Sequence, residues 1–399
     1  MRLLQIICDG SGAAELAAQL AAELEARGER APDWLCLQAS VGVDVDALRR
    51  AVAAAFPDTP VHGATSCLGA MTNAGARIGP GGAVGALALW DEAGDYATVA
   101  ARLGDDPAEA ARAAVAAACA AAGRPGEAPD LVWFSAVPGR EERLLDGINA
   151  AVGEETPVFG GSAADDDVTG RWSVFDATAR LTDGLVVSVL FPSGRVGHAF
   201  QSGYAPAGPA ATVTAGAGRH LAELDGRPAR EVFDAWTGGK VVQGPADGAV
   251  SVLSASTWSP LGRPDGTVAE IPFHLLLHPA QAEADGSLTL FADVAVGDRL
   301  YLMAGSPESL TARAARTATL AMETADIAPC DVAGALIIFC GGSMLAMQDA
   351  MGNVAQQLDA ALEGAPFLAG FTFGEQGHTI AGHNCHGNLM ISAVVFARS

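Results

Sequence analysis

Three loops carry the residues of this chain that are best suited to bind a ligand. Each loop follows a strand-like run that begins with proline and is rich in glycine and hydroxyl residues. The candidates in these loops are His62, Thr65, Ser66, Gly160, Gly161, Ser162, Asp165, Asp166, Thr372 and Glu375. Glycine lets the backbone approach a ligand closely, and a hydroxyl group both donates and accepts hydrogen bonds. The sequence therefore predicts a polar small-molecule site.

The carboxylates suggest what such a site could bind. Asp166 and Glu375 each lie nine residues after the proline of their own repeat, and Asp165 adds a further acid. Acids beside hydroxyl groups suit an ammonium or a polyhydroxylated ligand, while exposed loop amides could take a carboxylate. The alternative is that the small residues form tight turns and that 165–167 is a solvated acidic turn.

Cys340 is a candidate nucleophile or redox sensor. It ends an apolar run and precedes Gly341 and Gly342, where a helix is expected to begin. A thiol at a helix N-terminus can have its pKa lowered by the helix dipole. The alternative is a small buried residue at a crowded strand end.

Four histidines are candidate metal ligands. His378, His383 and His386 lie with Cys385 in one short segment whose nitrogen and sulfur donors could hold zinc or iron, although a hairpin loop explains the segment equally well. His62 lies in an apolar strand and is either a haem ligand or a core histidine with hydrogen-bond partners. The chain has no Cys-x-x-Cys-His motif, which excludes covalently attached c-type haem.

One pattern, repeated three times, positions these residues. Each copy has an apolar strand, an amphipathic helix and a proline-led strand, in Trp34–Pro60, Leu131–Pro157 and Leu336–Pro366. The first two copies have the same length, and the third is longer by about one helical turn. Each copy is also expected to have a preceding strand and helix, in the third copy at Leu300–Ala304 and Pro307–Glu323, and a closing strand.

This pattern predicts an α/β fold of repeated βαβ units that form two packed domains with mixed sheets. We place an N-terminal domain at 1–200 and a C-terminal domain at 201–399, with an irregular β-rich insert at about 201–296. Ligands of α/β sheets bind beyond the carboxyl ends of parallel strands. The loop mouths 62–69, 160–167 and 370–378 are therefore expected to form one site.

Composition narrows the functional classes. The net charge of −23 argues against nucleic-acid and anionic-membrane partners, because binding phosphates needs clustered lysine and arginine. The seven cysteines form no Cys-x-x-Cys pair, which favours reduced thiols. No signal peptide and no run of about 18 apolar residues are visible, so a cytoplasmic location is expected.

Several motifs together resemble the FIST family of bacterial signal-transduction proteins. They are Pro157-Val-Phe-Gly-Gly-Ser-Ala-Ala-Asp-Asp166, Leu224-Asp-Gly-Arg-Pro-Ala229, Gly370-Phe-Thr-Phe-Gly-Glu-Gln-Gly377 and His386-Gly-Asn-Leu-Met390. Their order matches the family along nearly the whole chain. The resemblance implies paired FIST N- and C-terminal domains and a sensory role with an amino-acid-like ligand. Some family members bind haem and sense nitric oxide, which is an alternative here.

The output of such a sensor is expected to pass through a separate partner. No kinase, methyl-accepting or cyclic-di-GMP domain is fused within the 399 residues, so a histidine kinase or a cyclic-di-GMP enzyme is the expected partner. No nucleophile elbow, P-loop or zinc-protease motif occurs. We therefore expect a non-enzymatic sensor. A hydrolase that uses Cys340 or Glu375, and a pure protein-interaction module, are the alternatives.

Overall fold

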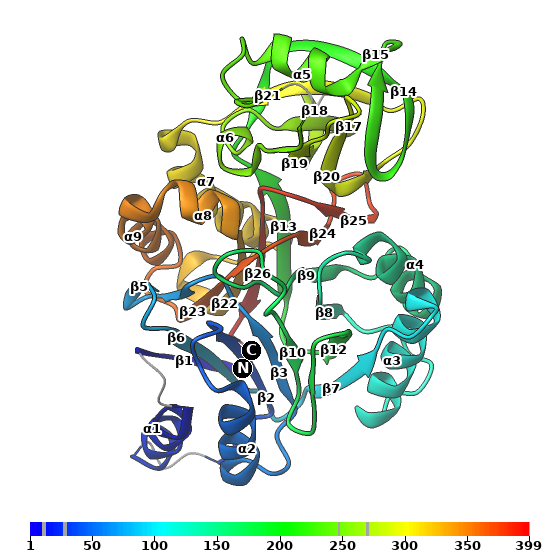
Figure 1. The fold of residues 1–399 in the computed structure, drawn as a ribbon. Coiled ribbons are helices and arrows are strands. Elements are labelled where there is room, and N and C mark those ends of the chain that lie inside the picture. The colour runs from blue at the N-terminus through cyan, green and yellow to red at the C-terminus, as the bar shows by residue number, and fades with distance from the viewer. Residues whose placement is uncertain (10–12, 27–29, 246–247, 269–270, 399) are drawn as a thin grey trace.

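The chain folds as three similar α/β units and one inserted β-rich lobe (Figure 1). The computed structural model describes residues 1–399 except 10–12, 27–29, 246–247, 269–270 and 399. Each unit has a mixed sheet whose four main strands follow the same order: first strand, closing strand, second strand and third strand. The predicted α/β class with repeated βαβ units is confirmed.

The elements of the first two units follow the expected pattern. Unit 1 contains β1 (Arg2–Asp9), α1 (Ala13–Ala26), β2 (Trp34–Ala39), α2 (Val45–Ala55), β3 (Val61–Thr65) and β6 (Ala83–Trp90). Unit 2 contains β7 (Asp95–Arg102), α3 (Pro107–Ala121), β8 (Leu131–Ala136), α4 (Glu141–Val152), β9 (Val158–Ser162) and β12 (Gly184–Phe191). In both units the second and third strands are parallel, and the closing strand runs antiparallel to its neighbours.

The third unit is interrupted by the insert. It contains β13 (Val196–Ser202), α7 (Pro307–Thr324), β22 (Val332–Cys340), α8 (Gly341–Ala346), α9 (Met351–Ala361), β23 (Phe367–Thr372) and β26 (Met390–Ala397). The strand expected at Leu300–Ala304 does form, but it pairs within the insert, whereas β13 pairs with the closing strand β26. The single amphipathic helix expected between the two strands of this copy is divided, because the chain passes through a short 3-10 turn at Gln348–Ala350.

Local chemistry explains where the helices begin. The side chain of Asp106 accepts hydrogen bonds from the amides of Ala108 and Glu109, and Pro107 occupies the first turn of α3. Ser306 caps α7 in the same way, with Pro307 in its first turn. Such caps satisfy amides that the helix leaves unpaired. The helix expected at Pro307–Glu323 begins where it was predicted.

Each unit contributes a β-hairpin that pairs with the sheet of another unit. These hairpins are β4 (Gly69–Thr72) with β5 (Gly75–Ile78), β10 (Val174–Phe175) with β11 (Arg180–Leu181), and β24 (Glu375–His378) with β25 (Asn384–Gly387). The hairpin of unit 1 extends the sheet of unit 3, that of unit 2 extends unit 1, and that of unit 3 extends unit 2. The exchange is cyclic, so the three loop mouths are joined around a common centre.

The core lies on both faces of these sheets. The helices cover the outer faces, where α1 packs on α2, α3 on α4 and α7 on α9 (Figure 1). The inner faces meet in one large cluster that contains Trp34, Trp133 and Leu336. The central strands β2, β8 and β22 are buried along their whole length, as continuous apolar runs between two packed faces require.

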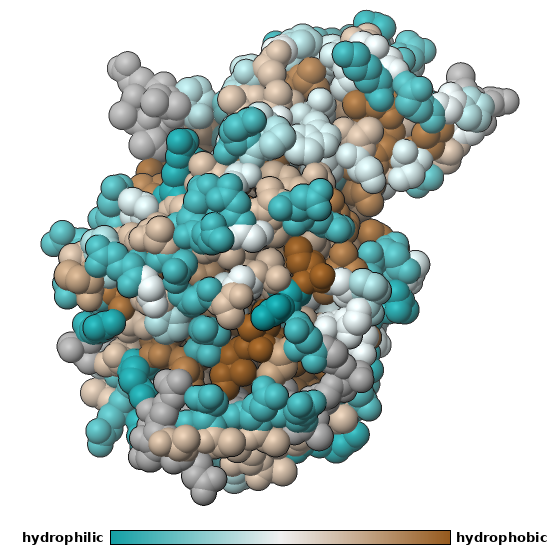
Figure 2. All heavy atoms as spheres, turned by 90° about the vertical axis from the view of Figure 1, so that its left-hand side faces the viewer, coloured by the Kyte–Doolittle hydropathy of each residue, from teal (hydrophilic) through white to brown (hydrophobic). Residues whose placement is uncertain are grey.

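The insert forms a separate lobe at the top of the molecule (Figure 1, Figure 2). Its elements are β14 (Ala205–Leu224), β15 (Arg227–Pro228), α5 (Ala229–Trp236), β16 (Val250–Ser251), α6 (Leu253–Ser256), β17 (Leu261–Val268), β18 (Ile271–Leu277), β19 (Pro279–Ala282), β20 (Leu288–Val294) and β21 (Arg299–Ala304). A core of its own packs beneath α5. Among the helices of the described residues, none is long and apolar enough to cross a membrane.

Candidate functional site

The three loops that follow β3, β9 and β23 are joined by main-chain hydrogen bonds. The amide of Cys67 in the first loop donates to the carbonyl of Phe371 in the third at 2.9 Å. The amide of Ser162 at the end of β9 donates to the carbonyl of Gly374 at 2.8 Å. Residues far apart in the sequence therefore share one small region.

Most of the small polar residues in these loops bind the backbone. Thr65 Oγ1 accepts a hydrogen bond from the amide of Ser173 at 2.9 Å. Ser66 Oγ donates to the carbonyl of Gly69 at 2.6 Å and accepts from the amide of Phe371 at 2.8 Å. Both side chains are fully buried. Their hydroxyl groups hold the loops together, as the tight-turn alternative describes.

The glycine pair of the second loop allows two strands to approach closely. Gly160 has a φ of 149°, and a Cβ atom there would lie 1.7 Å from the carbonyl oxygen of Phe134. A Cβ atom on Gly161 would lie 2.5 Å from Cγ2 of Thr372. A larger residue at Gly160 would collide with β8 within the sheet of unit 2, and one at Gly161 would collide with Thr372 at the end of β23 in unit 3.

The acids of the second loop brace the loop itself. Asp165 is fully buried, and its carboxylate accepts hydrogen bonds from the amides of Val168 at 2.6 Å and Arg171 at 2.9 Å. Asp166 Oδ1 accepts from the amide of Leu68 at 2.8 Å, which joins the second loop to the first. The carboxylate oxygens of Asp165 and Asp166, which were expected to bind a ligand, accept hydrogen bonds from backbone amides instead.

Ser162 belongs to a buried polar network. Its hydroxyl donates to Oε1 of Glu141 at 2.7 Å, and Glu141 also forms an ion pair with Arg219 of the insert. Burial acts to raise the pKa of Glu141, but His386, Arg219 and hydrogen bonds together hold that pKa below its usual value. The network fastens the insert to unit 2. Sequence analysis missed Glu141 and Arg219, because neither lies in a motif.

Glu375 is buried where the third loop turns into β24. The Thr372 hydroxyl donates to its Oε1 at 2.9 Å, and the amide of Met390 donates to Oε2 at 3.0 Å. Burial nevertheless raises the pKa of Glu375 to about 8. At neutral pH the side chain is therefore largely protonated and uncharged.

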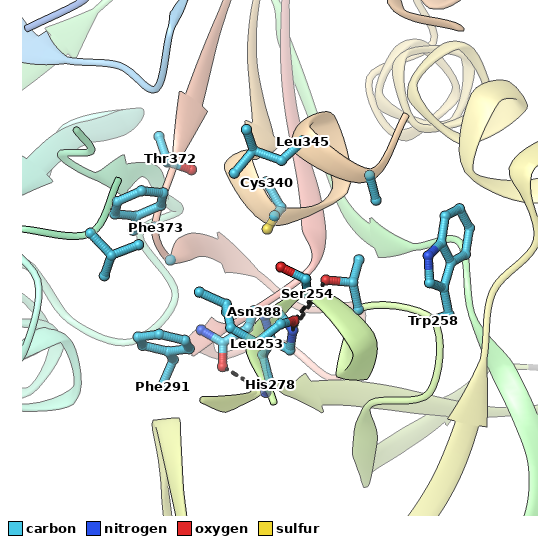
Figure 3. A pocket seen from close by; sticks show the side chains of 15 residues that line it. Leu253, Ser254, Trp258, His278, Phe291, Cys340, Leu345, Thr372, Phe373 and Asn388 are labelled. Atoms are coloured by element: carbon cyan, nitrogen blue, oxygen red, sulfur yellow. Dashed lines mark hydrogen bonds between the residues drawn. The ribbon is translucent and has the colours of Figure 1, made fainter. Parts of the chain in front are cut away.

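A cavity lies between the insert and the carboxyl end of β22. Its volume is about 310 Å³, which is in the range of small-molecule pockets. Figure 3 shows the lining side chains. They are Val168, Leu253, Ser254, Thr257, Trp258, His278, Phe291, Cys340, Gly342, Leu345, Ala346, Thr372, Phe373, Gly374 and Asn388. Of the predicted site residues, Cys340 and Thr372 line this cavity.

The insert supplies the half of the cavity that sequence analysis did not find. Leu253 and Ser254 come from α6, His278 follows β18 and Phe291 comes from β20. His278 Nε2 lies 3.0 Å from the carbonyl oxygen of Leu253, and burial lowers the pKa of this histidine to about 4. These residues follow no recognisable spacing, because the long insert folds back onto the loop mouth of unit 3, the unit that it interrupts.

Cys340 directs its sulfur into the cavity (Figure 3). Burial, and to a smaller degree the nearby Glu375, raise the pKa of this thiol above its ordinary value. The amides of Gly342, Ser343 and Leu389 act in the opposite direction but do not prevail. The expectation of a lowered pKa at the start of α8 is wrong, because burial outweighs the helix terminus.

His62 lies between the sheets of units 1 and 2, away from the cavity. Its two ring nitrogens lie 2.9 Å from Ser188 Oγ and 3.1 Å from Ser135 Oγ, and its ring packs against Trp34 and Trp133. Burial lowers its pKa to about 3. Both nitrogens are already engaged in a filled core, so this residue does not fit a haem iron.

The other candidate metal ligands lie on the hairpin formed by β24 and β25. His378 Nδ1 lies 3.0 Å from Asn384 Oδ1, His383 Nε2 lies 3.1 Å from Asp265 Oδ1, and His386 Nε2 lies 3.2 Å from a backbone carbonyl. Across the described residues, no group of three or more histidines, cysteines or acids is placed to hold a metal ion. The segment forms the hairpin that was the alternative prediction.

Comparison with known protein families agrees with this arrangement. The FIST N domain matches residues 33–227, and the FIST C domain matches residues 230–378. The chain belongs to the FIST family. The cavity of this FIST protein is lined by Val168 from the N-terminal match and by residues such as Leu253 and Cys340 from the C-terminal match. FIST domains are associated with sensing in signal transduction.

Comparison with individual proteins adds little. None of the curated proteins matches this chain. Among solved structures, the FIST protein is similar to a cyanuric acid hydrolase from A. caulinodans, with 11% sequence identity over 100% of this chain and 99% of that chain. The TM-score is 0.36. A likeness at this level carries no argument about activity.

Proposed function

We propose that this FIST protein is a sensor that binds a small molecule in the cavity between the insert and unit 3. The observation that supports this proposal is the cavity itself, which is lined from both FIST domains and lies at the loop mouth of a parallel strand pair. The signal passes to a separate signalling protein, such as a histidine kinase or a cyclic-di-GMP enzyme.

The position of the cavity suits a sensor. One wall is formed by the insert through Leu253, Ser254 and His278, and the other by unit 3 through Cys340 and Phe373. The chain passes between the insert and unit 3 at 202–205 and again at 304–307. A ligand that contacts both walls favours one arrangement of the two parts, which a partner protein can read.

Two matched substitutions on α6 test binding in the cavity. Ser254 is exposed and lines the cavity, whereas its neighbour Ala255 is exposed outside the lining. Ser254→Trp fills the cavity, and Ala255→Trp adds the same side chain beside it. Thermal unfolding is measured for the wild type and both variants with a panel of metabolites. We expect at least one metabolite of the panel to stabilise the wild type and Ala255→Trp, but not Ser254→Trp. As the ligand of a sensor, this metabolite is not chemically converted by the protein.

A panel without such a compound, or equal stabilisation of all three proteins, contradicts the proposal. Signalling is tested by measuring autophosphorylation of a candidate histidine kinase, or turnover by a candidate cyclic-di-GMP enzyme, with each of the three proteins and the stabilising compound. The compound is expected to change the output with the wild type and Ala255→Trp only.

A hydrolase-type enzyme is the second candidate. It is favoured by the Cys340 thiol in the cavity and by Glu375, which lies behind it and is close enough to perturb the thiol. A protonated carboxyl beside a thiol can supply general acid chemistry. Consumption of the bound compound, with loss of turnover in Cys340→Ala or Glu375→Gln, distinguishes this enzyme from a sensor.

A further inference from the structure

We infer that the cavity takes an uncharged, mostly apolar ligand that carries an aromatic ring, and that it rejects charged amino acids. This inference rests on the proposed function and names the ligand class of the same site. It departs from the amino-acid-like ligand that the family resemblance implies.

No charge of the protein faces the cavity. Its fifteen lining residues include no aspartate, glutamate, lysine or arginine. His278 is held neutral by burial, with Nε2 beside the carbonyl of Leu253. Asp165 and Asp166, the acids expected to bind an ammonium group, are not among the lining residues, and their carboxylates accept hydrogen bonds from the backbone amides of Val168 and Leu68.

The polar groups of the lining are few, and several are already engaged. Thr372 donates to Glu375 at 2.9 Å, and Thr257 donates to the carbonyl of Leu253 at 3.1 Å. Asn388 accepts from the amide of His278 at 3.1 Å. The hydroxyl of Ser254 points across the cavity toward Cys340 (Figure 3). Such a lining can orient one or two neutral polar atoms of a ligand.

Burying an ionised group without a partner of opposite charge is strongly unfavourable. A zwitterionic amino acid brings both an ammonium and a carboxylate, and the lining offers neither an anion nor a cation to pair with them. A neutral ring loses no ionic hydration on binding. The lining therefore favours neutral over charged ligands, whatever their shape.

The apolar side chains fit an aromatic ligand. Phe291 and Phe373 stand on one side of the cavity, Trp258 on the other and Leu345 above (Figure 3). Val168 and Leu345 are each 38% exposed, and they are two of the four large hydrophobic side chains that are exposed among the described residues. Both side chains add partly exposed apolar surface to the lining. Aromatic rings also pack well against aromatic walls.

Four probes that share one ring system test the inference. Indole is neutral, tryptamine is a cation, indole-3-acetate is an anion and L-tryptophan is a zwitterion. Binding of each to the full-length protein is measured by isothermal titration calorimetry. We expect indole to bind at least 10-fold more tightly than each charged probe.

Ser254→Asp places a carboxylate at the cavity, and Ala255→Asp places one beside it. We expect Ser254→Asp to weaken indole binding at least 10-fold and to improve the relative affinity for tryptamine, while Ala255→Asp leaves both unchanged. Leu345→Asp, on the opposite wall, serves as a second variant if Ser254→Asp does not fold. Circular dichroism confirms folding.

The outcomes separate this inference from the proposed function. Equal or tighter binding of any charged probe overturns the inference but leaves a ligand site in place, provided that Ser254→Trp abolishes the binding. Failure of indole to bind also overturns it, and the metabolite panel with Ser254→Trp and Ala255→Trp then decides the proposed function independently.

Discussion

Replacing Glu375 with glutamine is expected to stabilise the protein at neutral pH and to remove part of its pH dependence. The carboxyl is fully buried between Thr372 and Met390, and burial raises its pKa from 4.5 to about 8. Glutamine has nearly the same shape, and its amide oxygen can still accept a hydrogen bond from the Met390 amide. It carries no charge at any pH.

The magnitude follows from the two pKa values. Between pH 4.5 and about 8, the unfolded chain has released a proton that the folded protein keeps, so the free energy of unfolding falls as the pH rises. One pKa unit corresponds to about 1.4 kcal/mol, so wild-type Glu375 removes about 3 kcal/mol of stability between pH 4.5 and pH 7. Glu375→Gln does not lose this stability, because glutamine carries no charge at either pH.

The assay is urea unfolding followed by tryptophan fluorescence at pH 5 and pH 7. The stability of Glu375→Gln relative to the wild type is expected to rise by about 2.5 kcal/mol from the lower to the higher pH. Glu155→Gln, the same exchange at an exposed site, is the control and should show no such change. A constant difference between Glu375→Gln and the wild type would refute the claim that Glu375 is protonated in the folded protein.

Three further substitutions test other parts of the structure. His62→Phe removes a base whose pKa falls to about 3 in the folded protein. As the pH falls from 7 to 5, the wild type is therefore expected to lose about 2 kcal/mol of its free energy of unfolding relative to this variant. If urea unfolding shows the same pH dependence of stability for both proteins, this prediction is contradicted. Arg219→Met leaves Glu141 buried without its cation and should destabilise the protein by about 3 kcal/mol. Adding Glu141→Gln to this variant should recover part of the lost stability. If the losses of the two single variants simply add in the double variant, Arg219 and Glu141 do not interact. Asp165→Ala removes the acceptor of several amides, including that of Val168, and should lower the free energy of unfolding by about 2 kcal/mol. An unchanged midpoint in denaturant titration would show that the Asp165 carboxylate does not stabilise the loop.

Much of the fold was predictable, because each unit has its own local signals. Fully apolar runs such as Leu131–Ala136 indicate central strands, and the pair Asp106 and Pro107 indicates a helix start. The sheet to which a strand belongs is not a local property. The strand at Arg299–Ala304 directly precedes a helix in the sequence, as in the other units, yet it pairs inside the insert.

Less of the site was predictable, for a similar reason. The loops were expected to meet, and the bond between Cys67 and Phe371 joins two of them. Their polar residues serve mainly the backbone, because so many buried amides meet at this point and need acceptors. Leu253 and His278 come to the cavity from the insert, whose position depends on contacts such as that of Arg219 with unit 2.

A crystal structure of the protein grown with the compound that stabilises it most would test the ligand site directly. Electron density for the compound between His278 of the insert and Cys340 of unit 3, in contact with Phe373, is the result that the proposed function predicts. Density for the compound elsewhere on the protein, with this cavity unfilled, would contradict it.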